Sequence, residues 1–173
     1  LSALLRSSRV GLIGEPFEGM SDFSVPQNVL KASVGIDVVE FKAADFRNLH
    51  TSITGPEIQK EKERVTSRYE RSPDLSDEAL ERSIHTGQVL KKWVEQEDLS
   101  AVTFNFQYVK RDEGFETVPF LGVSEMMARG IGYAGEGDVL TAGLMGAIAS
   151  VYPETSFSEM FCPDWENGAV FLS

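Results

Sequence analysis

The sequence predicts an α/β fold: a three-layer, Rossmann-like arrangement in which a mostly parallel sheet has helices on both faces. Short apolar runs over residues 9–14, 35–41 and 101–106 are typical of strands, and helical stretches separate them. Strands that alternate with helices form βαβ units, and parallel strands buried on both faces show no polar alternation. The chain has 173 residues, 42% of them hydrophobic, so we expect residues 1–173 to form a single α/β domain.

Helices are predicted from hydrophobic spacing and from the residues that begin or end them. Ser76 precedes two acidic residues and predicts the start of a long helix with an apolar stripe from Leu80 to Val94. Asp138 is the expected cap of an almost wholly apolar helix. The other expected elements are helices over 26–33, 56–71, 121–129 and 139–152, a glycine-rich loop over 130–137, and a last strand beginning at 168. Segments 15–22, 42–54 and 105–116 are expected to be loops at the carboxyl ends of strands, where α/β proteins form their sites.

The composition narrows the possible functions. The net charge is −11, and residues 101–173 carry 10 acidic but 3 basic residues. Nucleic acids and anionic membrane surfaces attract Lys and Arg patches, so we expect neither partner. No apolar run approaches the roughly 20 residues of a membrane span, and the single cysteine fits a reducing, cytoplasmic compartment. The chain lacks an initiator Met and stops in an apolar run, so we expect both ends to be cuts through a longer chain.

Two glycine-rich segments match nucleotide-binding loops only as strings. Gly130, Gly132 and Gly135 have the spacing of the dinucleotide fingerprint, but a predicted helix precedes them where the fingerprint requires a strand. The loop after the first strand is better placed, and Glu40 could bind a ribose. However, that loop begins with an acidic, proline-containing turn at Glu15, which makes it a poor phosphate cradle.

The histidines and the cysteine form no recognisable catalytic set. His85 falls beside the apolar stripe of the long helix and is expected at the helix edge, whereas His50 lies in a predicted loop and its role is open. A metal ligand needs neighbouring ligands, which neither histidine has in sequence. Cys162 is far from both histidines, so we expect it to behave as a small buried hydrophobic residue.

Two carboxylates are the strongest candidates for chemistry. Gly135 and Gly137 flank Glu136, so that carboxylate can be aimed inward by unusual backbone angles. The apolar helix that follows should be buried on most sides, with Glu136 at one end and Glu159 beyond the other. Two inward carboxylates are costly unless protons or a cation compensate them, and hard oxygen ligands suit Mn²⁺ or Mg²⁺. Equally, Glu136 could be a loop acid near a helix N-terminus and Glu159 an exposed surface acid; spacing alone leaves both interpretations open.

These segments carry a family resemblance. Residues 132–138 and 141–144, followed by Thr155–Glu159, resemble the L-arabinose isomerase / L-fucose isomerase-like superfamily, with supporting matches at Thr103–Phe106 and Val118–Leu121. Residues 14–23 look more like those of uncharacterised sugar-isomerase relatives. The resemblance covers most of this chain but only the middle part of such an enzyme.

The resemblance implies aldose–ketose isomerisation of a pentose or 6-deoxyhexose through a cis-enediol. In this family a divalent metal, usually Mn²⁺, holds and polarises the substrate, and carboxylates move the proton. By motif, Glu136 and Glu159 match the two family glutamates that bind metal and act as acid and base. Sugar contacts are expected from the loop after the first strand, at Glu15, Phe17, Met20 and Asp22. The family also usually assembles as homo-oligomers.

The departures from the family bear on activity. Histidines complete the family's metal site, the first of them just after the strand that ends here at Ser173, and neither His50 nor His85 matches a ligand motif. The family's N-terminal α/β domain and C-terminal β-rich domain are not in this sequence. We therefore expect a central fragment of a longer isomerase-like chain that is inactive alone. A non-enzymatic, Rossmann-like carbohydrate- or nucleotide-binding domain is the alternative, which a natural stop after Ser173 would favour.

Overall fold

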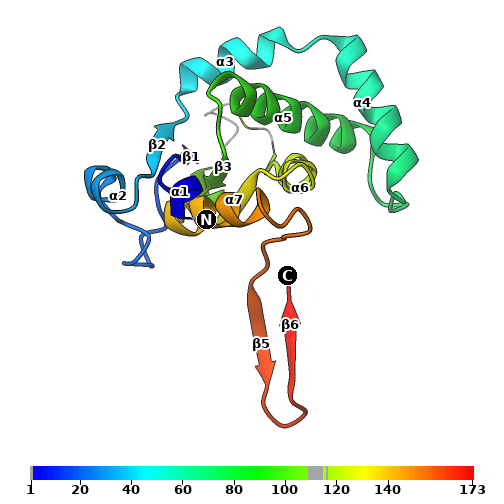
Figure 1. The fold of residues 1–173 in the computed structure, drawn as a ribbon. Coiled ribbons are helices and arrows are strands. Elements are labelled where there is room, and N and C mark those ends of the chain that lie inside the picture. The colour runs from blue at the N-terminus through cyan, green and yellow to red at the C-terminus, as the bar shows by residue number, and fades with distance from the viewer. Residues whose placement is uncertain (1, 109–114, 116) are drawn as a thin grey trace.

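A four-stranded parallel sheet forms the centre of the molecule, in a computed structural model that describes residues 2–108, 115 and 117–173 (Figure 1). The strands lie in the order β2-β1-β3-β4, and each neighbouring pair is parallel. Their bounds are Arg9–Ile13 for β1, Asp37–Glu40 for β2, Ala101–Phe104 for β3 and Gly132–Gly135 for β4. The central pair is in register from Val10, opposite Ala101, to Ile13, opposite Phe104.

Helices cover both faces of this sheet, which confirms the predicted α/β class. On one face Val10, Leu12 and Ala101 pack with side chains of α2 (Gln27–Ser33) and α7 (Val139–Ala149), and Leu5 of α1 (Ser2–Leu5) joins them. On the other face Ile13, Val102 and Phe104 pack with three helices: α3 (Ala43–Ser52), α5 (Asp77–Gln96) and α6 (Phe120–Met127). Successive residues of a strand point to opposite faces, so each strand contributes to both cores.

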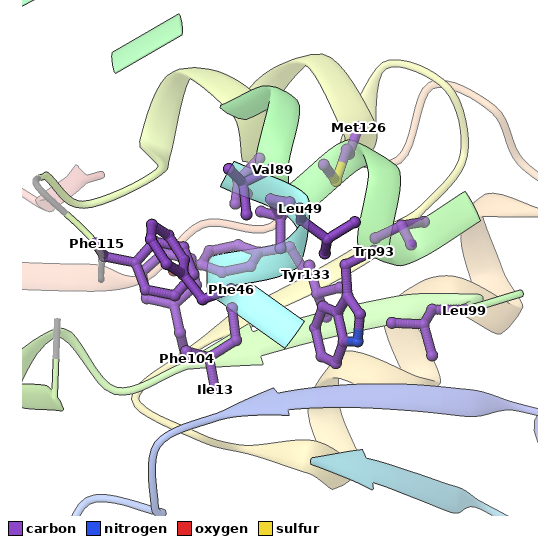
Figure 2. Close-up of a cluster of buried hydrophobic side chains, with 14 residues drawn as sticks. Ile13, Phe46, Leu49, Val89, Trp93, Leu99, Phe104, Phe115, Met126 and Tyr133 are labelled. Carbon is purple, nitrogen blue, oxygen red and sulfur yellow. The ribbon is translucent and has the colours of Figure 1, made fainter. Parts of the chain in front are cut away.

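The larger core is aromatic. Trp93 of α5 is 1% exposed, and a Cβ atom on Gly11 would lie 2.5 Å from its ring, so the indole packs directly on the backbone of β1 (Figure 2). The ring of Phe41 meets Trp93 edge-on at 4.7 Å, and the ring of Phe115 lies 5.0 Å from that of Phe46. Edge-on and tilted ring pairs add to the free energy gained by burying these side chains.

Two segments expected to be loops are regular elements. Residues 43–52 form α3, which begins where the Lys42 backbone N–H donates to Asp45 at 3.1 Å and which buries Phe46 and Leu49. His50 is therefore on a helix, not in a loop, and its ring lies 4.2 Å from that of His85 on α5. Residues 132–135 form β4 within the predicted glycine-rich loop, because its glycines allow close packing rather than a turn.

The contact between β4 and α7 explains those glycines. A Cβ atom on Gly132 would lie 2.1 Å from the backbone nitrogen of Gly146, so the helix rests on the strand with no side chain between them. Asp138 caps α7 as predicted, since its carboxylate accepts from the Thr141 N–H at 2.9 Å. Helix α7 is buried on most sides, as predicted, and only the face with Leu140 and Leu144, which are 42% and 45% exposed, meets solvent.

The last predicted strand exists but does not join the sheet. Strands β5 (Met160–Asp164) and β6 (Ala169–Leu172) form an antiparallel hairpin that extends away from the sheet (Figure 1). Its residues are exposed, Cys162 among them, so the expectation of a buried cysteine is wrong. Among the described residues, no helix is long and apolar enough to cross a membrane.

Helix α4 (Gly55–Arg68) packs on α5 outside the sheet layers, and a buried carboxylate links it to α6. Glu125 accepts from the Tyr69 hydroxyl at 2.6 Å and pairs with Arg64 at 2.7 Å and Arg68 at 3.7 Å. Burial would raise the pKa of Glu125, but the hydrogen bonds of Tyr69 and Arg64 and the nearby positive charges outweigh it and lower the pKa. A buried charge with this many partners is costly to disturb.

We expect Glu125→Gln to lower the free energy of unfolding by about 2 kcal/mol at pH 7, because two arginines lose their buried partner. The folded-state pKa is depressed, so this stabilisation is complete above the unfolded pKa of about 4.3 and is lost as the pH falls through the folded value. Urea unfolding between pH 3 and 7 measures it. The exposed Glu78→Gln is the control, and equal effects of the two variants would contradict the prediction.

Gly132→Ala should lower the free energy of unfolding by at least about 3 kcal/mol, because the new methyl group meets the α7 backbone, which cannot move without unpacking the helix. Gly55→Ala is the control: nothing lies within 4 Å of its Cβ position, so we expect no change or a gain of up to about 1 kcal/mol. Thermal unfolding of the two variants side by side checks this. Comparable melting temperatures would mean that the β4–α7 contact is looser than described.

Candidate active site

The turn after β4 aims Glu136 away from the strand. Glu136 has a φ of 60°, a left-handed conformation that is unusual outside glycine, and Gly137 follows with a φ of 82°. The Glu136 carbonyl accepts from the Phe17 N–H at 2.9 Å. A Cβ atom on Gly137 would lie 2.7 Å from Cα of Pro16, so glycine is required there by both angle and space. The loop after β1 therefore holds the Glu136 turn in place.

Glu159 reaches the same region from a distant part of the chain. It lies at the base of the β5–β6 hairpin, where its backbone N–H donates to the Ser173 carbonyl at 2.8 Å and the Ser173 N–H returns a bond of 3.1 Å. Glu136 and Glu159 both line a cavity of about 530 Å³ at the carboxyl ends of β3 and β4. Its other lining residues are Phe104, Phe106, Phe120, Met127, Tyr133, Gly135, Phe157, Phe161 and Ser173.

The environment of this cavity acts on the ionisation of Glu159 and Tyr133. Burial raises the pKa of Glu159, and the negative charge of Glu136 raises it further. Burial also raises the pKa of Tyr133, with contributions from the charges of Glu159 and then Glu136. Carboxylates that share a site without a compensating cation shift in this direction. The arrangement favours binding either a proton or a cation.

The four predicted sugar-contacting residues divide into two pairs. The Glu15 carbonyl accepts from the Asn105 side chain at 3.1 Å, and the ring of Phe17 lies 6.4 Å from that of Phe106 in the cavity wall. These contacts bring Glu15 and Phe17 to the loops that follow β3 and β4. Met20 and Asp22 lie exposed further along the loop and do not line the cavity that contains Glu136 and Glu159.

Sequence reasoning missed two residues at this edge. Asn105 is 1% exposed directly after β3, and its side chain bonds both Glu15 and the Gln107 N–H. A buried amide at the carboxyl end of a strand is the pattern that could have indicated it. Tyr133 was assigned to a loop, although it lies on β4 with its ring in the core.

The nucleotide-binding interpretation gains no support from the geometry. A second cavity, of about 560 Å³, lies at the carboxyl ends of β1 and β2, but Glu40 there accepts from the Gln27 side chain at 2.7 Å. Residues 14–26 separate β1 from α2, so no helix N-terminus directly follows the strand. The Gly130-Gly132-Gly135 string runs through β4 itself, with Gly132 against α7.

The metal-ligand set in this chain is partial. Within residues 2–108, 115 and 117–173, no group of three or more His, Cys, Asp and Glu side chains could hold a metal ion. Glu136 and Glu159 could supply two hard oxygen ligands to a divalent cation. The pair fits part of such a site, and further ligands would have to come from water, substrate or elsewhere.

Comparison with known proteins identifies the family. The model of the L-arabinose isomerase central domain matches residues 28–152, which include Glu136 and end before Glu159. The L-arabinose isomerase of Shouchella clausii (strain KSM-K16) is 27% identical over 141 residues, or 80% of this chain. That alignment spans 28% of the relative's length. Because the family model covers well over half of the sequence, the chain belongs to the L-arabinose isomerase central-domain family.

Proposed function

We propose that this chain is the central portion of a metal-dependent aldose–ketose isomerase, with Glu136 and Glu159 in its active site. The observation that carries the proposal is the meeting of these two carboxylates, from the turn after β4 and the base of the hairpin, in one cavity. Family membership supports the reaction class. The chain corresponds to 28% of the length of its relative, so the activity belongs to a longer protein.

Glu136 and Glu159 would be the ligands that this chain contributes to a divalent cation such as Mn²⁺. Carboxylate oxygens suit that ion, and its charge would offset the repulsion that raises the pKa of Glu159. When bound, the cation would polarise the sugar carbonyl and hold the neighbouring hydroxyl. Two ligands are too few for tight binding, so we infer that the 173-residue chain alone is inactive.

Isomerisation moves one hydrogen between the two carbons of the carbonyl and its neighbouring hydroxyl. A base removes the proton from C2 of the aldose and returns it to C1 through a cis-enediol, while the proton of the O2 hydroxyl passes to O1, with no net gain or loss of protons. We assign this role to Glu159 because it matches a family glutamate by motif and lines the same cavity as Glu136. Glu136 lines the same cavity, and the Phe17 N–H holds its backbone in place.

The cavity also bears on the substrate. Two carboxylates and several phenylalanine rings line it, and among the residues that the structure describes no Lys or Arg lines it. An uncharged sugar, a pentose or a 6-deoxyhexose, matches this surface better than a sugar phosphate. We further infer a cytoplasmic enzyme that assembles as a homo-oligomer, in keeping with its family and its single cysteine.

In the complete protein, Glu136→Gln and Glu159→Gln should each lower kcat at least about 100-fold, because each removes a carboxylate that moves a proton or holds the cation. Assays with Mn²⁺ and L-arabinose or L-fucose measure this. Glu166→Gln, in the exposed hairpin turn, is the control and should keep its rate. Near-normal rates for a variant would remove that residue from the site, and turnover by residues 1–173 alone would contradict the inferred inactivity.

Without metal, Glu159→Gln should raise the melting temperature at pH 7.5, since it removes a carboxylate whose ionisation the folded state disfavours. The folded pKa is raised, so the wild type is penalised above that pKa and the advantage of the variant disappears as the pH falls through it. Scanning calorimetry at pH 7.5 and 4 in chelator measures this. A variant less stable than the wild type at pH 7.5 would show that the carboxylate pair is already compensated.

A further inference from the structure

We propose that Tyr133 is an additional functional residue of this site, whose hydroxyl donates a hydrogen bond to an oxygen of a sugar bound over Gly135, beside Glu159. The inference rests on the proposed function for the nature of the ligand. It goes beyond it by assigning a donor that neither the sequence motif nor the family match identifies.

The Tyr133 ring is fixed on both sides. It is 7% exposed and lies among the side chains of the larger core, near Phe104, whose ring is 5.3 Å away (Figure 2). The Phe157 ring meets it edge-on at 5.5 Å. The strand beneath it is held by Thr103, whose hydroxyl donates to the Ala134 carbonyl at 2.8 Å. A ring clamped in this way holds its hydroxyl at one place, which is what orienting a ligand requires.

That place borders the position that a Cβ atom on Gly135 would occupy. A Cβ atom on Gly135 would lie 3.5 Å from Oε1 of Glu159 and 3.9 Å from the Tyr133 hydroxyl. Both distances are ordinary van der Waals contacts, so the space can hold a small group next to both oxygens. Because residue 135 is glycine, it has no side chain of its own at this position.

The Tyr133 hydroxyl is free to bind a ligand there. Among the described residues, every fully buried side-chain nitrogen or oxygen has a hydrogen-bond partner, and the Tyr133 hydroxyl makes no such bond. It is therefore not sealed in the core, and Tyr133 lines the cavity with Glu136 and Glu159. The contrast is Tyr69, whose hydroxyl is committed to Glu125 at 2.6 Å.

The Tyr133 hydroxyl supplies a hydrogen-bond donor that Glu136 and Glu159 lack when they are ionised. Ionised Glu136 and Glu159 are hydrogen-bond acceptors alone, whereas a sugar carbonyl or ring oxygen needs a donor. Most other lining side chains are phenylalanines, which cannot supply one. Burial and the neighbouring charges keep Tyr133 protonated, so its hydroxyl remains a donor over the working pH range.

The test uses Tyr133→Phe and Gly135→Ala in the complete protein, with Tyr69→Phe as the matched control. Tyr133→Phe removes one oxygen and leaves the clamped ring, so we expect kcat/KM for the sugar to fall about 10-fold or more with little change in melting temperature. Gly135→Ala fills the space without a clash and should raise KM and weaken binding of a pentitol measured by calorimetry. Tyr69→Phe should do the opposite: a lower melting temperature and an unchanged kcat/KM.

The outcomes separate this inference from the proposed function. If Glu136→Gln abolishes turnover while Tyr133→Phe keeps wild-type kcat, KM and pentitol affinity, the role of Tyr133 is refuted and the isomerase stands. If the wild type shows no sugar turnover, the proposed function is refuted, and pentitol binding decides the role of Tyr133. Loss of pentitol binding in both Tyr133→Phe and Gly135→Ala would uphold the role of Tyr133. Unchanged binding in these variants, or no binding by the wild type, would overturn it.

Discussion

The backbone contact between β4 and α7 is the constraint on which the rest of the site depends. Gly132 allows the helix to approach the strand, and from the helix side a Cβ atom on Gly146 would lie 2.6 Å from the Ser100 carbonyl. The helix can therefore begin right after the strand, with Asp138 as its cap. So short a connection leaves room for one turn, and the chain makes it with Glu136 in a left-handed conformation. The position of the Glu136 carboxylate therefore depends on the packing of Gly132 against Gly146, although neither glycine is next to it in sequence.

The loops that follow β1, β3 and β4 are joined by hydrogen bonds at the carboxyl ends of these strands. Asn105, after β3, bonds the Glu15 carbonyl after β1, and Phe17 of the same loop bonds the Glu136 carbonyl after β4. The β1 loop thus covers the point between β1 and β3 where the strand order changes direction, the usual place for a ligand in such sheets. The carboxylate cavity lies instead beyond β3, at the ends of β3 and β4. The loop acts as a support for the site rather than as a phosphate cradle.

Features that depend on neighbouring residues in the sequence, such as helix caps, are predicted well. Features that depend on packing between distant segments, such as strand β4, are predicted poorly. Ser76 and Asp138 cap helices because a side-chain oxygen beside a free N–H is a local matter. Strand β4 was missed because its glycines suggest a loop until the helix that lies on Gly132 is known. For the candidate site, Glu136 and Glu159 were identified from motif resemblance, but their meeting depends on the path of the chain after α7. Tyr133 could not be selected, since its value comes from the space over Gly135.

Two features that cost stability occur together at the carboxyl ends of β3 and β4: a left-handed backbone at Glu136 and a raised pKa at Glu159. Neither feature identifies a site by itself. Left-handed backbone also occurs at Asp98, in the turn before β3, and at Cys162 in the hairpin, where it only reverses or bends the chain. At Glu136 the same strain coincides with a neighbouring carboxylate whose pKa is raised. Glu125, in contrast, is more buried yet fully paired, with a pKa shifted downward. The contrast between one buried acid that is fully paired and a second whose pKa burial and a neighbouring charge raise is the reason why we propose Glu136 and Glu159, rather than Glu125, as site residues.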